Sequence, residues 1–166
     1  MAKKRNKKIA DDREPRQEQV RVAILGFGTV GSAVAKLLHA RRDTGVHITH
    51  VFNRGVHRKK ADWLGGDVVW TENFEDVLAP EVDAVLELVG NVELANEWVR
   101  RALAAGKHVI AVNKQLIARY GSELVALARK SQTRMAFGAA VAGVIPVIPA
   151  VLEGLSGDKF YKLSGI

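Results

Sequence analysis

Three glycines with the spacing Gly-x-Gly-x-x-Gly stand where a phosphate-binding turn would use them. They follow an apolar run at Val20–Leu25 and open a helical pattern. In this context the first glycine allows a tight turn, the second lets a pyrophosphate approach the backbone, and the third lets the helix pack closely. Amide groups at the helix start attract the phosphates. The predicted cofactor-binding residues of this turn are Gly26, Gly28, Thr29, Val30 and Gly31.

The residues after the second apolar run bear on the choice between NAD and NADP. A carboxylate there binds the ribose 2′-hydroxyl of NAD, whereas an arginine suits the 2′-phosphate of NADP. Asn53 occupies this position, Arg54 follows it, and residues 57–60 are all basic. Because an arginine can bind a phosphate through two parallel hydrogen bonds, the sequence favours NADP(H) over NAD(H), with Asn53 and Arg54 at the ribose. A solvated basic loop is the alternative, and the two interpretations can hold for different residues of the cluster.

The elements that must position these residues alternate between short apolar runs and longer helical stretches. This alternation predicts an α/β fold, a Rossmann-type doubly wound parallel sheet with strand order 3-2-1-4-5-6. Near-continuous apolar runs are typical of strands that helices cover on both faces. The predicted strands are Val20–Leu25, His47–Phe52, Asp67–Trp70, Ala84–Val89, His108–Val112 and Arg134–Gly138. The predicted helices are Val30–Arg41, Arg58–Leu64, Glu72–Leu78, Val92–Ala105 and Ser122–Lys130.

Composition divides the chain into three expected parts. Residues 1–19 form a polar, basic tail that we expect to be disordered. Residues 20–143 form the dinucleotide-binding domain. Residues 144–166 form a connecting segment, with a short helix at Ala150–Leu155 and a strand at Lys159–Ile166 that would begin a truncated second domain.

The bulk composition excludes several classes of site and location. The 166 residues are 48% hydrophobic, which is enough for a full core without a metal or a disulfide. There are no cysteines, so thiolate zinc sites and cysteine nucleophiles are excluded, and no metal site is predicted. No apolar run approaches the roughly 18 residues of a membrane span. The tail lacks the apolar core of a secretory signal, so we expect a cytoplasmic protein without a membrane partner.

The net charge of +7 raises the question of nucleic acid. Seven basic and four acidic residues lie in the first 19 positions. A basic tail can bind nucleic acid through its phosphates. However, this tail has no aromatic stacking residue and no nucleic-acid motif follows it, so a solvated tail is the favoured interpretation.

Four further observations concern the segments Val22–Gly31, Pro80–Gly90, Ala105–Lys114 and Ala139–Ile148. Together these four segments resemble homoserine dehydrogenase. The glycine motif is common to many families, whereas the last two segments are much more discriminating, and the order of the segments matches too. The resemblance covers residues 20–166.

The resemblance implies reversible reduction of aspartate 4-semialdehyde to homoserine with a nicotinamide cofactor, a step towards threonine and methionine. It places Val89, Gly90 and Gly143 at the cofactor, and it directs Asn113 and Lys114 into the active site. Lys114 also follows a predicted parallel strand, where open α/β sheets bind ligands. A cation there can polarise the aldehyde oxygen or take part in proton transfer, so Lys114 is the predicted catalytic residue. A solvent-exposed lysine at a helix start is the alternative.

Three departures from the family pattern limit this expectation. Gly138 stands where the family has a glutamate of a monovalent-cation region, and Val144 replaces a glycine near the nicotinamide or substrate. The sequence also ends where the family continues into its substrate domain. We therefore expect NADP(H) binding with little or no turnover. We further expect the last strand to fray or to pair between copies as a homo-oligomer.

Two other functions compete with this enzyme hypothesis. Rossmann domains also serve as NAD(P)-sensing regulatory modules without catalysis, since a fold alone does not decide function. Lys114 argues against this alternative, because a sensor needs no active-site lysine. A nucleic-acid binder driven by the tail is the weakest of the three hypotheses.

Overall fold

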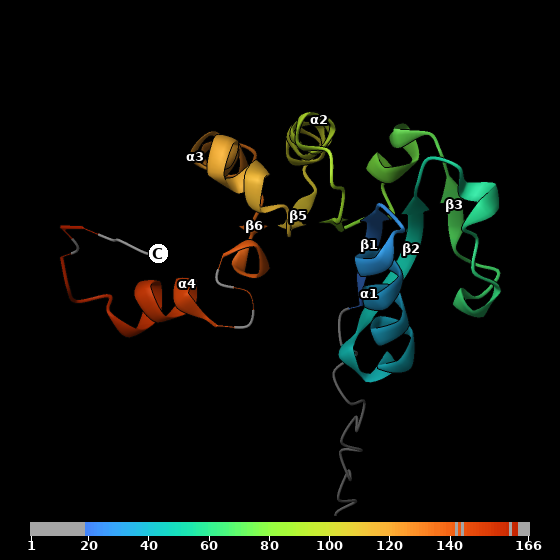
Figure 1. Cartoon of the computed structure of the whole chain (residues 1–166), viewed down its shortest axis with the longest axis horizontal. Coiled ribbons are helices and arrows are strands. Elements are labelled where there is room, and N and C mark those ends of the chain that lie inside the picture. The colour runs from blue at the N-terminus through green and yellow to red at the C-terminus, as the bar shows by residue number, and fades with distance from the viewer. Residues whose placement is uncertain (1–18, 142, 144, 160, 163–166) are drawn as a thin grey trace, which may run out of the picture.

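A computed structural model describes residues 19–141, 143, 145–159, 161 and 162 of the chain. Its centre is a six-stranded sheet in the order β3-β2-β1-β4-β5-β6, and all neighbouring strands run parallel (Figure 1). This order confirms the predicted doubly wound fold. The strands are β1 Val20–Leu25, β2 Val46–Phe52, β3 Val69–Thr71, β4 Ala84–Glu87, β5 His108–Ala111 and β6 Met135–Ala136.

Three helices of two or more turns connect the strands. They are α1 Thr29–Ala40, α2 Val92–Ala104 and α3 Lys114–Lys130. An asparagine begins each of the last two: Asn91 accepts a hydrogen bond from Leu94 N–H, and Asn113 accepts one from Leu116 N–H. The predicted start of α3 at Ser122 is therefore wrong, since the cap at Asn113 starts the helix two turns earlier.

Two predicted helices are also wrong. The stretches Arg58–Leu64 and Glu72–Leu78 form only short three-ten turns, at Val56–Arg58, Asp62–Leu64 and Phe74–Leu78. Glycines at positive φ, Gly55 at +73° and Gly65 at +92°, stand before the first turn and after the second. Segments this short do not offset the cost of starting an α-helix, so they close into turns that return the chain to the sheet.

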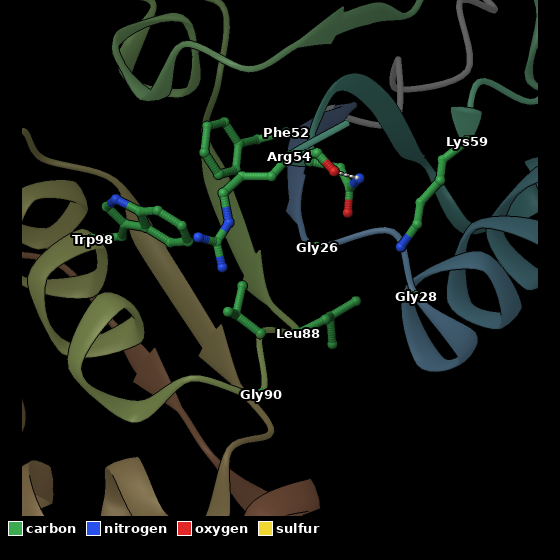
Figure 2. Close-up of a pocket in the computed structure, with 10 residues that line it drawn as sticks. Gly26, Gly28, Phe52, Arg54, Lys59, Leu88, Gly90 and Trp98 are labelled. Carbon is green, nitrogen blue, oxygen red and sulfur yellow. Dashed lines mark hydrogen bonds between the residues drawn. The ribbon is translucent and has the colours of Figure 1, made fainter. Parts of the chain in front are cut away.

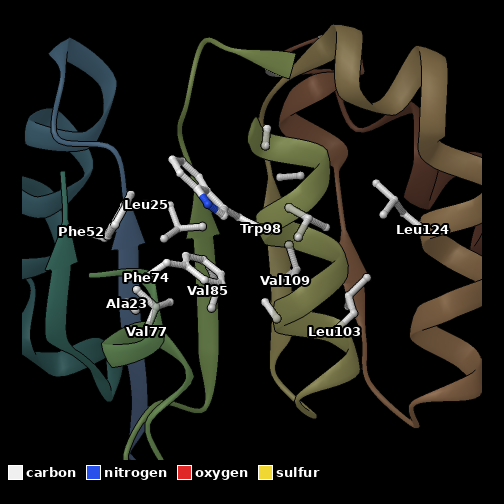
Figure 3. Packing of buried hydrophobic residues seen from close by; sticks show 14 of the residues in the cluster. Ala23, Leu25, Phe52, Phe74, Val77, Val85, Trp98, Leu103, Val109 and Leu124 are labelled. Carbon is white, nitrogen blue, oxygen red and sulfur yellow. The ribbon is translucent and has the colours of Figure 1, made fainter. Parts of the chain in front are cut away.

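The side chains of β1 alternate between two cores, one on each face of the sheet. Ala23 and Leu25 point to the face that α2 and α3 cover, and Val22 and Ile24 point to the face that α1 covers. The first core also holds an aromatic group, with Trp98 of α2 packed edge-on against Phe52 at a ring-centroid distance of 4.8 Å (Figure 3). Burial on both faces explains why the strands read as apolar runs.

The segment after β6 contains a short helix, α4 Val147–Pro149, which continues into a wider π-helical turn at Ala150–Gly154. The helix predicted at Ala150–Leu155 therefore starts earlier than expected and changes its geometry. Figure 1 shows α4 lying beyond β6, away from the rest of the sheet. Of the strand predicted at Lys159–Ile166, residues 160 and 163–166 lie outside the described residues, and the other three are in no strand. Residues 1–18 of the predicted tail also lie outside them. No helix among the described residues is long and apolar enough to cross a bilayer.

Candidate nucleotide-binding site

The turn after β1 has the backbone geometry that its glycines predict. Gly26 has φ of +94°, and a β-carbon there would stand 2.9 Å from the carbonyl oxygen of Leu88. A β-carbon on Gly31 would stand 2.0 Å from the carbonyl oxygen of Gly26, so only a glycine lets α1 sit against the turn. A β-carbon on Gly28 would meet nothing within 4 Å. The first and third glycines are thus required by packing, whereas Gly28 leaves open space at the helix start.

A cavity of about 390 Å³ opens at this turn, at the point where the strand order reverses (Figure 2). Its walls come from the ends of β1, β2 and β4 and from α2. The lining residues are Gly26, Gly28, Phe52, Asn53, Arg54, Lys59, Leu88, Val89, Gly90 and Trp98. Ligands of open α/β sheets bind at such a switch point, outside the carboxyl ends of the strands. Five other predicted cofactor-binding residues, four of them glycine or valine, therefore share one cavity with Arg54.

Asn53 joins the glycine turn to the end of β2. The residue is buried, its side-chain oxygen accepts a hydrogen bond from Phe27 N–H at 3.1 Å, and its amide donates to the carbonyl of Arg54 at 2.6 Å. Both ends of the side-chain amide are thus bound to backbone. The structure thus gives Asn53 a role in fixing the turn, while its place beside the ribose stays a prediction.

Two cations line the β2 side of the cavity. Arg54 and Lys59 are both exposed to solvent, and Figure 2 shows the Lys59 side chain extending toward the Gly28 turn. Among the described residues that line the cavity, none is a carboxylate. Arg54 could be predicted from the sequence, whereas Lys59 could be predicted only as one member of a basic cluster, because spacing alone does not show which member faces the cavity.

A buried acid occupies the opposite side. Glu87, the last residue of β4, is fully buried, and its two oxygens accept hydrogen bonds from Val89 N–H at 2.8 Å and Asn113 N–H at 3.3 Å. Burial raises the pKa of Glu87, and the backbone donors oppose this rise. No role was predicted for Glu87, although it stands out in the sequence as an acid inside an otherwise apolar run.

The family model described as "Homoserine dehydrogenase, NAD binding domain" matches residues 26–138, which is most of the chain and includes every residue that lines the cavity. The chain belongs to the homoserine dehydrogenase family. The homoserine dehydrogenase of Bacillus subtilis is 38% identical over 154 residues, and that of Pseudomonas aeruginosa is 41% identical over 154 residues. Each match covers 89% of this chain and 36% or 35% of the relative.

Solved homoserine dehydrogenase structures show the same fold. The crystal structure from Thiobacillus denitrificans aligns with a TM-score of 0.73 at 38% identity, covering 84% of this chain and 34% of that one. A hyperthermophilic archaeal homoserine dehydrogenase in complex with NADPH aligns with a TM-score of 0.65 at 25% identity, covering 80% and 48%. This chain thus spans about a third of the length of the curated homoserine dehydrogenases that it matches.

The remaining predicted residues do not line the cavity. Thr29 and Val30 are exposed in the first turn of α1. Asn113 is half-buried and its side chain donates a hydrogen bond to Val89 O, and Lys114 is the exposed first residue of α3. Gly143 lies exposed in a turn beyond β6, with φ of +61°.

Two residues, Gly138 and Val144, depart from the family pattern, and the structure describes only the first of them. Gly138 is exposed at the start of a three-ten turn, Gly138–Ala140, while Val144 lies outside the described residues. No group of three or more His, Asp or Glu side chains that could hold a metal ion occurs within the described part of the chain.

Proposed function

We propose that this cavity binds NADP(H) in preference to NAD(H), for the interconversion of aspartate 4-semialdehyde and homoserine. The observation that carries the cofactor preference is the pair of cations, Arg54 and Lys59, on the β2 side of a cavity whose lining holds no carboxylate among the described residues. A 2′-phosphate would find two positive partners there, and no lining acid would repel it. The archaeal relative was solved in complex with NADPH, which supports use of the phosphorylated cofactor.

The pyrophosphate belongs at the start of α1 in this proposal. The first turn of α1 holds no acidic residue, and Gly28 offers no side chain to cap the helix. The free amide groups and the positive end of the helix dipole therefore remain available to the phosphates. With the adenosine end at Arg54, the nicotinamide end then extends toward Val89 and Gly90.

The nicotinamide supplies the hydride when the cofactor is bound, and Lys114 is the side chain that we assign to the substrate. Lys114 starts α3, directly after β5 and Asn113. Its ammonium group can stabilise negative charge that develops on the aldehyde oxygen. Asn113 donates a hydrogen bond to Val89 O at 2.9 Å, which ties the backbone of Lys114 to the nicotinamide side.

Paired substitutions test the cofactor preference. Arg54→Gln should weaken NADPH binding about tenfold and change NADH binding less than about twofold, because only NADPH carries the phosphate. The matched control is Arg58→Gln, since Arg58 is exposed in the same loop but folds over Gly55. Lys59→Gln and its neighbour Lys60→Gln form a second pair. Calorimetric titration of each variant measures its affinity for NADPH and for NADH. Equal losses of affinity for the two cofactors in Arg54→Gln would contradict the assignment of Arg54 to the 2′-phosphate.

We also propose that the 166-residue chain binds the cofactor with little turnover of homoserine. The chain spans about a third of the length of its relatives, and both cations that line its cavity lie on the adenosine side, away from the reacting end of the cofactor. A general acid–base group typically speeds such a reaction about 10²- to 10⁴-fold, so a chain that lacks one should turn over slowly. Absorbance at the NADPH band with homoserine and NADP⁺ measures the rate. Ordinary turnover would overturn this proposal and leave the binding proposal intact.

A further inference from the structure

Glu87 is a buried acid that the binding scheme above does not use. It ends β4 with no exposed surface. A buried carboxylate is costly unless hydrogen bonds replace its water, and an apolar side chain would avoid that cost. We therefore expect the carboxylate to make contacts that an apolar side chain could not make.

The carboxylate receives hydrogen bonds from two loops at once. One oxygen accepts from Val89 N–H, two residues along the chain, and the other accepts from Asn113 N–H, which follows the neighbouring strand β5. A carboxylate has two oxygens that both accept, so it can serve two donors that point at it from different sides. A glutamine would serve one of these donors and set its own amide hydrogens against the other.

Asn113 closes the same connection from the other side. Its amide donates to Val89 O at 2.9 Å, and its side-chain oxygen caps α3 through Leu116 N–H at 3.1 Å. Val89 thus has both its N–H and its carbonyl oxygen bound within one network. The network joins the loop after β4 to the start of α3.

We infer that Glu87 is a positioning residue, whose carboxylate fixes the Val89–Gly90 wall of the cavity relative to the start of α3. This inference rests on the proposed function, because Val89 and Gly90 matter only if the nicotinamide end of a cofactor lies against them. Glu87 touches no ligand in this scheme. It acts through two backbone amides, one beside the cofactor and one before Lys114.

Two ligands distinguish a displaced Val89–Gly90 wall from a general loosening of the protein in Glu87→Gln. NADPH reaches both ends of the cavity, whereas 2′,5′-ADP carries the phosphate and adenosine end alone. We expect calorimetry to show NADPH affinity falling about tenfold and 2′,5′-ADP affinity changing less than about twofold. The matched control is Glu97→Gln, an exposed glutamate of α2, which should change neither affinity.

A second variant keeps the inference testable if Glu87→Gln does not fold. Asn113→Ser retains a side-chain oxygen that caps α3 but loses the amide donor to Val89. It should reduce NADPH affinity about three- to fivefold, with 2′,5′-ADP again unchanged. Equal losses for the two ligands in either folded variant, or no loss for either, would overturn the inference.

Amide hydrogen exchange separates this inference from the proposed function. In the cofactor-free protein, Glu87→Gln should speed exchange at Val89 and Asn113, while the amides of β1 keep their protection. Wild-type protein that bound neither NADPH nor 2′,5′-ADP would remove the proposed function, even if the exchange pattern changed as expected. Unchanged exchange at both amides would remove the inference alone.

Discussion

The two sides of the cavity use their polar groups in opposite ways. On the β2 side, Arg54 and Lys59 are exposed and turn their charges toward the space a ligand would fill. On the β4 side, Glu87 and Asn113 direct their polar atoms into the protein, where they hold backbone. One side is thus equipped to recognise charge and the other to hold a shape. Substitutions should therefore change ligand choice on the first side and ligand placement on the second.

The glycine turn underlies both sides, so its disruption should have the largest effect. Gly31→Ala places a methyl group 2.0 Å from the carbonyl oxygen of Gly26, and the backbone must move. We expect a loss of about 3 kcal/mol or more in the free energy of unfolding, together with loss of NADPH binding. Gly28→Ala is the matched control, because a methyl group there meets open space and stability should change by less than about 1 kcal/mol.

Urea unfolding and NADPH titration of both glycine variants make this measurement. Gly28→Ala should fold normally yet bind NADPH more weakly, since its methyl group occupies the approach of the pyrophosphate. A Gly31→Ala protein as stable as wild type would show that α1 can shift away from the turn, and both sides of the cavity would then be less rigid than the packing indicates.

The two capping asparagines provide the next largest contrast. Asn91 caps α2 through Leu94 N–H, whereas Asn113 caps α3 and also holds Val89. Loss of a cap costs about 1 kcal/mol, so Asn91→Ala should lose about that much and Asn113→Ala about twice as much. Only Asn113→Ala should weaken NADPH binding. Equal losses of stability would mean that the bond to Val89 contributes nothing, and the β4 side would lose its distinction.

The pH dependence of stability tests the buried acid. Burial raises the pKa of Glu87, so the carboxyl group holds its proton more tightly in the folded protein than in the unfolded chain. The contribution of Glu87 to stability is therefore greatest below its ordinary pKa and declines as the pH rises through the folded pKa. The stability of wild type minus that of Glu87→Gln should fall with rising pH, by at most about 1.4 kcal/mol per pH unit. Urea unfolding across the acid range measures it, and a flat or rising difference would contradict a raised pKa.

The contrast between the sides also explains what the sequence could predict. Strand order and the glycine turn depend on apolar periodicity and on local spacing, and both were predicted correctly. The bounds of each predicted strand lie within about two residues of the observed ones. Arg54 follows the end of β2 in the chain, so its place at the cavity could be predicted by counting.

Other features depend on contacts between distant segments. Glu87 meets Asn113 only because β4 and β5 pair in one register, with Glu87 opposite Ala111. The double use of Asn53 likewise requires the turn after β1 to come within hydrogen-bond distance of β2. Between β2 and β4, the strand predicted at Asp67–Trp70 was found, but the helices predicted on either side of it, Arg58–Leu64 and Glu72–Leu78, were not. Gly55 and Gly65 at positive φ, together with the shortness of the segments, instead yield isolated turns.

The smallest expected effect comes from the opposite end of β4 and tests whether the network at Glu87 is local. Asp83 precedes β4 and accepts hydrogen bonds from both the backbone and the guanidinium of Arg21, which lowers the pKa of Asp83. Its contribution is present above the ordinary pKa and is lost as the pH falls, opposite in sign to that of Glu87. Because the pair is partly exposed, Asp83→Asn should cost only about 0.5–1 kcal/mol at neutral pH, measured by urea unfolding.

NADPH affinity should stay unchanged in Asp83→Asn, since Asp83 lies at the start of the strand whose end lines the cavity. If Asp83→Asn weakened NADPH binding as much as Glu87→Gln did, loosening of β4 anywhere would suffice, and the carboxylate of Glu87 would have no special role in holding the cavity wall.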